Sequence, residues 1–279
     1  MLRNKRIIII FCVLLFISIA AVLTSVLFTV GEIEVVCASK PEYLNINEEE
    51  LKEDIDINYS GKNIIFLDTK SLINQVEKDF PNVKVLNVER VFPKKVIITV
   101  KERLEVYCFT KGGKYIYTDF ECKVLRISDT KSDIYSGKVG QVIDVDFNPK
   151  NITSYQSGEI MNFIEHDAAQ FLTQLFLCST ENKDEVFFRN YIQNVDMTWF
   201  FLPLSTPEVL IKLSTGAEFT YYYNGDFVEK MILYMNKLVE NDDSTLPQID
   251  RISGRYLFSY TNGKIVFTDK TNGVEFTDF

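Results

Sequence analysis

Hydrophobic residues follow three patterns along the chain, and the first is a continuous apolar run. Ile7 to Val30 is 24 residues long and contains no charged residue. At about 1.5 Å per residue, a helix of this length crosses a bilayer core of roughly 30 Å. Arg3, Lys5 and Arg6 precede the run, and the positive-inside rule keeps such residues in the cytoplasm. The pattern predicts a single transmembrane helix at 7–30, with everything after it outside the cytoplasm.

A cleaved signal peptide is the alternative interpretation of this run. The sequence SIAA at Ser18–Ala21 is similar to a processing site, and the apolar part of a signal peptide is about 7–15 residues long. The run continues past these alanines to Val30. Its length therefore favours an uncleaved membrane anchor.

The second pattern combines helical and alternating periods. Glu32–Ala38 is strand-like in composition. Asn47, with Glu50 three residues later, has capping-box spacing and predicts the start of a short helix. Asp68 predicts the N-cap of a second helix, whose apolar residues share one face and which ends before Pro81.

A hairpin completes this part of the chain, in the sequence NVERVFPKKVIITVKER from Asn87 to Arg103. Strands are predicted at Val83–Phe92 and Lys95–Glu102, because apolar and polar residues alternate there. Pro93 presets the turn between them. The predicted order is β-α-α-β-β, an α+β arrangement in which two helices cover one face of a three-stranded sheet.

Serial short strands form the third pattern, beyond the hairpin. Turn signals at Gly112–Gly113, Thr215–Gly216 and Asn262–Gly263 join alternating segments, and the last predicts a type I′ hairpin. Amphipathic helices are predicted at Glu159–Leu177 and Asp226–Val239, with their aromatic residues in the core. This pattern indicates a mainly antiparallel β domain with packed helices.

Charge and cysteine content limit the functions available to the exported part. It carries 27 Lys and Arg against 39 Asp and Glu, a net charge of −12, which disfavours nucleic acid and anionic membrane surfaces as partners. Cys37, Cys108, Cys122 and Cys178 lack the spacing of a metal site. We interpret them as mostly buried free thiols, with a Cys108–Cys122 disulfide as the alternative.

Three motifs that suggest chemistry lack the rest of their sites. SDTK at Ser128–Lys131 has the S-x-x-K spacing of penicillin-binding enzymes, but the accompanying S-D-N and K-T-G elements are missing. The D-x-D-x-N runs at Asp54–Asn58 and Asp144–Asn148 lack the Gly and Glu that complete a calcium loop. His166, the only histidine, is predicted on a helix surface. We therefore predict no catalytic residue, no metal site and no cofactor.

Two sets of residues carry a resemblance to a known family. SGKNIIFLD at Ser60–Asp68 resembles a G-x-N-x-hydrophobic turn, and Arg90, Pro93, Glu102 and Arg103 match a V-x-R-x-x-P hairpin ending in E-R. Farther on, KYIYTDFECKVL and IDRISGRYLF are similar to strands of a second, β domain. Together they resemble the bacterial cell-division family FtsQ/DivIB, whose first extracytoplasmic domain is a POTRA domain. The resemblance implies the following parts: a cytoplasmic tail at 1–6, a transmembrane helix at 7–30, a POTRA domain at 31–103, a β domain at 104–269 and a flexible C-terminal tail at 270–279.

The resemblance also implies a function. Members of this family are non-enzymatic scaffolds of the divisome, anchored in the cell membrane at the division septum as single-pass proteins with a cytoplasmic N-terminus. They bind FtsL-like and FtsB/DivIC-like single-pass proteins through the exported part. With these partners they regulate the septal cell-wall synthase FtsW–FtsI.

The final hairpin is the predicted partner-binding site. An exposed sheet edge accepts a partner strand through main-chain hydrogen bonds, and the family contact is similarly placed near the last strands. Carried onto this chain, the prediction falls on Ile252, Arg255, Tyr256, Phe258 and Tyr260. We expect Phe258→Asp to abolish partner capture while the exported part stays folded. The alternative is that the three aromatic residues fill the core of the β domain.

Two other classes of protein are weaker alternatives. One is a POTRA-type chaperone for protein export or envelope assembly, which usually has several POTRA repeats or a C-terminal barrel. The chain shows one such domain and no barrel pattern. The other is an enzyme of cell-wall metabolism, for which a nucleophile motif is missing.

Overall fold

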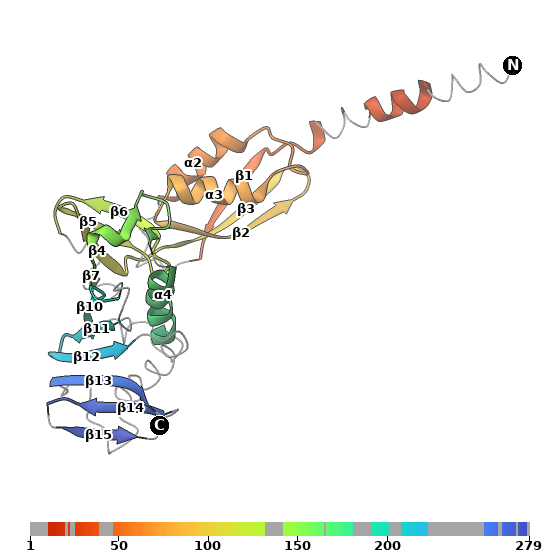
Figure 1. Ribbon diagram of the computed structural model, residues 1–279. Coiled ribbons are helices and arrows are strands. Elements are labelled where there is room, and N and C mark those ends of the chain that lie inside the picture. The colour runs from red at the N-terminus through yellow and green to blue at the C-terminus, as the bar shows by residue number, and fades with distance from the viewer. Residues whose placement is uncertain are drawn as a thin grey trace. The chain divides into compact units, whose positions relative to one another are not determined.

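The computed structural model divides the chain into two units, Met1–Glu102 and Arg103–Phe279, which we describe separately (Figure 1). Helices and sheets occur in separate segments, so the predicted α+β class is confirmed. The structure describes residues 11–19, 22, 26–38, 47–131, 142–164, 166–180, 191–200, 208–222, 254–261, 264–271 and 273–277.

The first unit is a three-stranded sheet with two helices, in the predicted β-α-α-β-β order. Its strands are β1 (Glu32–Cys37), β2 (Val83–Val91) and β3 (Lys95–Glu102), arranged β1-β3-β2. β1 runs parallel to β3, and β2 runs antiparallel to it. Helices α2 (Glu48–Tyr59) and α3 (Thr69–Asp79) follow β1 in the chain and contact β1 and β2, respectively.

Local capping determines where both helices begin. The Asn47 side chain accepts a hydrogen bond from the Glu50 amide at 3.3 Å, as the capping-box spacing predicts. The Asp68 carboxylate accepts from the amides of Lys70 and Ser71, at 3.0 and 3.1 Å. These bonds satisfy amides that have no partner within the first helical turn.

One face of the sheet carries the core of the first unit. Val96, Ile98 and Val100 alternate along β3 with more exposed residues, and each is at most 1% exposed. The same core includes Leu51 and Ile55 of α2. Further members come from α3, β1 and β2: Leu72, Val76, Ile33, Val83 and Val85.

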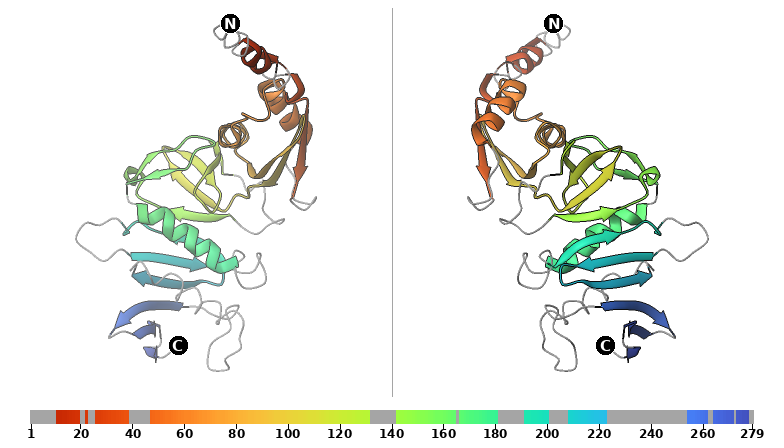
Figure 2. Two further views of the ribbon diagram at one scale, coloured as in Figure 1. Left: turned by 90° about the vertical axis from the view of Figure 1, so that its right-hand side faces the viewer. Right: turned by 90° about the vertical axis from the view of Figure 1, so that its left-hand side faces the viewer.

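The second unit is built on one long sheet (Figure 2). The strand order is β15-β14-β13-β12-β11-β10-β7-β4-β5-β6. The pairs β4–β7, β7–β10 and β12–β13 are parallel and the other pairs in this sheet are antiparallel. The strands are β4 (Tyr107–Lys111), β5 (Lys114–Thr118), β6 (Val124–Ser128), β7 (Ile143–Asp146), β10 (Ile192–Asp196), β11 (Glu208–Leu213), β12 (Ala217–Tyr222), β13 (Gly254–Thr261), β14 (Lys264–Asp269) and β15 (Val274–Thr277).

The first predicted helix of this unit starts later than its apolar period indicates. Helix α4 spans His166–Thr180, and the expected N-terminal portion contains strand β9 (Asn162–Phe163), which pairs with β8 (Ile152–Ser154). Ile160 instead bridges to Lys123. Phe163 is 9% exposed, with its ring centroid 5.8 Å from that of Phe109. Pairing with distant strands therefore overrides the helical period here. The other predicted helix, Asp226–Val239, lies outside the described residues.

The predicted membrane span at 7–30 falls partly outside the described residues. Residues 11–19 form a helix. Among the helices that the structure describes, none has both the length and the apolar character needed to traverse a bilayer. Val30 is 2% exposed and Phe28 packs against the same cluster, so the core of the first unit begins before residue 31.

Candidate protein-interaction sites

Strand β13, which carries most of the predicted partner-binding residues, lies inside the sheet. It pairs with β12 on one side and with β14 on the other. Tyr256 is 6% exposed and Phe258 1%, and both rings pack on Phe219, with centroid distances of 5.2 and 5.8 Å. The core alternative therefore describes these two aromatic residues, and Phe258→Asp would bury a carboxylate in an apolar core. This burial favours unfolding of the variant over the expected folded protein that loses its partner.

The other predicted partner-binding residues differ in position. The Arg255 side chain is 79% exposed, and its Nε donates to Glu218 Oε2 at 3.1 Å. Tyr260 lies in β13 opposite Ile265 of β14. Ile252 falls outside the described residues.

The sheet ends one strand later than predicted. Residues 274–277 form β15, which pairs antiparallel with β14 from Val266↔Thr277 to Asp269↔Val274. Among the described residues, β15 has no strand on its outer side. The β13–β14 hairpin is therefore not the edge, and the segment expected to be a flexible tail contains the edge strand. The sequence VEFT follows Gly273, which adopts a positive φ of 69°, but four residues are too few for alternation alone to predict a strand.

The first residues of β13 pack closely against Thr271, which leaves room only for glycine at position 254. Gly254 has a φ of +115°, and a Cβ at this position would lie 2.5 Å from Thr271 Oγ1. The same hydroxyl accepts a hydrogen bond from the Arg255 amide at 2.9 Å. Asp269, at the end of β14, accepts from the Thr271 amide at 2.8 Å. The β14–β15 turn is thus tied directly to the first residues of β13.

In the first unit, the hairpin arginine holds a loop in place. The Arg90 guanidinium donates to the carbonyl oxygens of Ile65 and Leu67, at 3.2 and 2.7 Å. These carbonyls belong to the segment just before α3, so Arg90 connects β2 to that loop. Pro93 lies exposed in the turn between β2 and β3.

Comparison with known families now identifies this unit. A family model described as "POTRA domain, FtsQ-type" matches residues 43–103. The chain carries an FtsQ-type POTRA domain. The resemblance predicted from the hairpin and the preceding turn is confirmed for this part of the chain. A search of curated proteins finds no match.

Strand β1 precedes the matched residues and joins the same sheet as the matched strands. It adds to the sheet by parallel pairing from Glu32↔Lys95 to Cys37↔Val100. Lys95 Nζ also contacts the carboxylates of Glu32 and Glu34, at 3.0 and 2.6 Å. The family match therefore describes α2, α3, β2 and β3, and the structure supplies the third strand.

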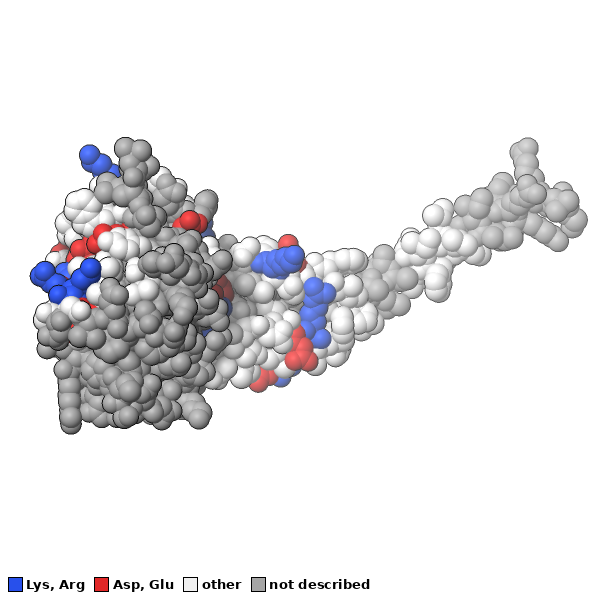
Figure 3. Space-filling model, turned by 60° about the horizontal axis from the view of Figure 1, so that its bottom comes forward, with Lys and Arg blue, Asp and Glu red and all other residues white. Residues whose placement is uncertain are grey.

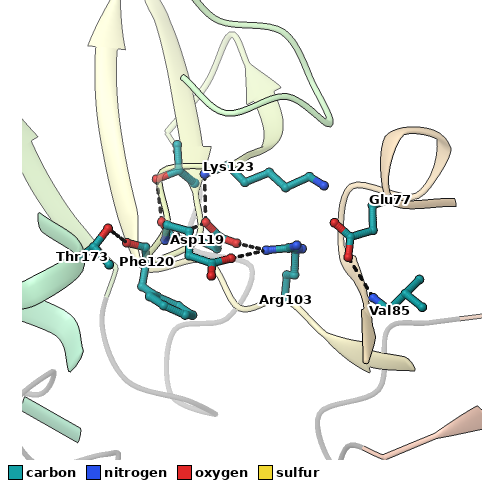
Figure 4. A network of polar contacts seen from close by, with 9 residues as sticks. Glu77, Val85, Arg103, Asp119, Phe120, Lys123 and Thr173 are labelled. Carbon is teal, nitrogen blue, oxygen red and sulfur yellow. Dashed lines mark hydrogen bonds and ion pairs between the residues drawn. The ribbon is translucent and has the colours of Figure 1, made fainter. Parts of the chain in front are cut away.

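The last matched residue, Arg103, anchors the start of the second unit. Glu102 and Arg103 are 5% and 7% exposed. Figure 4 shows the Arg103 guanidinium directed toward Asp119, with an Nη1–Oδ2 distance of 2.5 Å. The same nitrogen lies 2.9 Å from Glu121 Oε2. The Glu102–Arg103 sequence at the end of the matched residues is thus buried, and Arg103 forms a buried ion pair with Asp119.

Asp119 organises the turn before β6. Its Oδ1 accepts from the amides of Glu121 and Lys123, both at 2.9 Å. Burial raises the pKa of Asp119, and the Arg103 charge beside it offsets part of that increase. Cys122, in this turn, is fully buried with a positive φ of 60°, a conformation that glycine adopts more readily than other residues.

The described cysteines are free thiols. Cys108 and Cys122 are both buried and unbridged, and burial raises the pKa of the Cys122 thiol. Cys37 is also free and half-buried. The free-thiol interpretation describes these three, and the Cys108–Cys122 disulfide is not formed.

The motifs considered for chemistry have structural partners. Lys131 donates to Asp144 at 2.6 Å, and Asp146 accepts from Asn194 at 3.0 Å. Asn58, in the other D-x-D-x-N run, donates to the Asp54 carbonyl within α2. Within the described part of the chain, no cluster of His, Cys, Asp or Glu is arranged to hold a metal ion.

Proposed function

We propose that the chain is a non-enzymatic scaffold of the bacterial divisome, anchored in the cell membrane at the septum by its N-terminal helix. The observation that carries the proposal is the FtsQ-type POTRA domain at residues 43–103. POTRA domains of this type serve protein–protein contacts in cell division, and the partners expected from the family are FtsL-like and FtsB/DivIC-like single-pass proteins. Through them the scaffold would act on the septal synthase FtsW–FtsI.

Exposed apolar side chains support the anchor. In the helix at residues 11–19, the apolar side chains stand clear of the rest of the protein, and contiguous apolar surface of this kind favours a lipid environment. The following residues are each more than half exposed: Phe11, Val13, Leu14, Leu15, Phe16, Ile17 and Ile19.

The outer edge of β15 is the proposed partner-binding surface. A partner strand could extend the sheet there through main-chain hydrogen bonds, as in other edge-strand complexes. Of the predicted site residues whose exposure the structure describes, Arg255 is exposed. The buried Tyr256 and Phe258 would then support the edge from the core instead of contacting the partner.

Affinity capture of the tagged full-length chain from gently solubilised membranes of its own organism tests the function. Mass spectrometry should recover short single-pass proteins together with a septal transglycosylase or transpeptidase. Recovery of β-barrel or secretion components without them would contradict the divisome assignment and favour the export-chaperone alternative.

Proline variants of β15 test the edge in the same assay. Neighbouring residues of an antiparallel edge strand direct their amides alternately toward the sheet and away from it. Of Glu275→Pro and Phe276→Pro, one therefore removes an amide that faces β14 and the other an outward amide. We expect the variant with the outward amide removed to keep its thermal stability and lose the partner. If that thermally unchanged variant still captures the partner, the β15 edge is not the binding surface.

A further inference from the structure

Two loops of the POTRA unit hold the chain where it leaves the apolar N-terminal run. The first loop follows α2, and its backbone pairs with the residues just before β1. The Val30 amide donates to the Lys62 carbonyl at 2.8 Å, and the amides of Gly61 and Ile64 donate to the carbonyls of Val30 and Phe28, at 2.9 and 2.7 Å. The end of the apolar run is therefore fixed to this loop without an intervening linker.

The tip of the β2–β3 hairpin holds the same segment from another side. The Lys94 carbonyl accepts from the amides of Gly31 and Glu32, at 2.9 and 3.2 Å. The Phe92 ring meets the Phe28 ring edge-on, with a centroid distance of 6.0 Å. In Figure 1 this tip lies at the end of the sheet where β1 begins, consistent with the pairing of Glu32 with Lys95.

Both loops expose large aromatic side chains. Phe66 is 81% exposed, the highest value among the large apolar side chains that the structure describes, and Phe92 is 56% exposed. Ile64 and Leu67, on either side in the first loop, are 0% and 5% exposed. Arg90 donates to the carbonyl oxygens of Ile65 and Leu67 and so fixes the backbone on both sides of Phe66. In this conformation Ile64 and Leu67 lie in the core and the Phe66 side chain lies outside it.

The exported part as a whole is acidic, but each of the two loops carries an exposed lysine, and Asp68, which follows the first loop, caps α3. Lys62 and Lys94 are exposed and belong to the two loops. The charge of Lys95 is balanced by Glu32 and Glu34. On the face drawn in Figure 3, described basic and acidic side chains lie beside one another. Exposed phenylalanines that insert between acyl chains, with lysines near the headgroups, are found in segments that bind at the membrane interface.

We propose that residues 62–66 and 92–94 form a membrane-facing tip of the POTRA unit. Phe66 and Phe92 enter the headgroup region of the outer leaflet, and the ammonium groups of Lys62 and Lys94 meet lipid phosphates. The inference rests on the proposed anchor, because the apolar run ends at the residues that both loops hold. The occupant of this apolar surface is then the bilayer into which the preceding residues insert.

Lipid quenching of single tryptophans in the full-length chain tests the tip. The chain has one tryptophan, Trp199, and Trp199→Phe provides a background for Phe66→Trp or Phe92→Trp. Each variant is reconstituted into phosphatidylcholine vesicles containing brominated lipid. We expect a blue-shifted emission and a loss of fluorescence at both tip positions.

Leu86→Trp in the same background is the matched control. Leu86 is 48% exposed on β2, next to Val85, which pairs with Val100 near the other end of β3. At about 3.4 Å per residue, five residues of strand place it roughly 17 Å from the tip. Its emission should resemble that of a water-exposed tryptophan, with little quenching.

Flotation of the same vesicles separates this inference from the anchor on which it rests. A chain that floats but shows no more quenching at Phe66→Trp and Phe92→Trp than at Leu86→Trp would overturn the tip and leave the anchor intact. A chain that does not float with the vesicles would overturn the anchor and the tip together. Equal, strong quenching at all three positions would also contradict a tip, because the unit would then lie along the membrane.

Discussion

Removing the Arg103 guanidinium should destabilise the second unit far more than removing an exposed arginine. In wild type the Arg103 and Asp119 side chains are 6% and 2% exposed and form an ion pair at 2.5 Å. Arg103→Met leaves the Asp119 carboxylate buried and Glu121 without its 2.9 Å contact to this arginine. Breaking a buried pair from one side costs about 3–5 kcal/mol in free energy of unfolding. We expect the free energy of unfolding of Arg103→Met to be lower than that of wild type by an amount in that range at neutral pH.

The loss should depend on pH, with a sign that follows from Asp119. Burial already raises the pKa of this carboxyl, and removing Arg103 takes away the main charge that opposes the increase. A carboxyl with a folded-state pKa above its unfolded value binds a proton more readily in the native protein. The variant should therefore recover stability as the pH falls through that raised pKa. Adding Asp119→Asn to Arg103→Met should recover part of the loss at neutral pH and remove this pH dependence.

Urea unfolding followed by the fluorescence of Trp199 measures both effects, since this single tryptophan lies in the second unit. Arg255→Met is the control, because its side chain is 79% exposed and pairs with Glu218 at the surface. Such surface pairs contribute about 0–1 kcal/mol. If Arg103→Met were no less stable than Arg255→Met at neutral pH, the buried pair would not support the second unit as described.

Two further predictions concern the turn at β13 and the loop before α3. Gly254→Ala should lower the free energy of unfolding by roughly 1–3 kcal/mol through backbone strain and the clash with Thr271. In urea unfolding, Gly216→Ala should cost less, because a Cβ there meets open space; an equal cost would contradict a role for the clash. Arg90→Met removes two donors, and loss of such bonds costs about 1–3 kcal/mol locally. Hydrogen exchange at residues 64–67 should accelerate, and unchanged exchange would show that Arg90 does not hold the loop.

The first unit could be predicted almost completely from the sequence because its signals are local. Asn47 and Asp68 cap their helices through side chains that lie within three residues of the bonded amides. Alternation along β3 then indicates which face carries the core. The strand order β1-β3-β2 and the parallel pairing of β1 with β3 were not predicted, because they depend on contacts between residues far apart in the chain.

The candidate interaction site was predicted less well because its geometry depends on distant pairing. The aromatic residues of β13 have the same alternation whether the strand is at an edge or inside a sheet, so the sequence left both alternatives open. The neighbours of β13 decide the outcome: β12 pairs with it on one side and β14 on the other. The edge position passes to β15, formed by residues expected to be a tail, because β15 pairs with the outer side of β14. A four-residue strand such as VEFT is too short to stand out from its surroundings by periodicity.

The two proposed surfaces can be tested independently because they belong to different units. The tip residues Phe66 and Phe92 lie in the POTRA unit, while β15 lies in the second unit. Substitutions in independent folding units that share no partner usually act additively, so we expect a proline in β15 to leave lipid quenching at the tip unchanged. Phe66→Asp should likewise leave the free energy of unfolding of the second unit, measured in urea, unchanged. If it also weakens partner capture, the reason must be that capture requires the POTRA unit to be held at the membrane, which would connect the two surfaces in one mechanism.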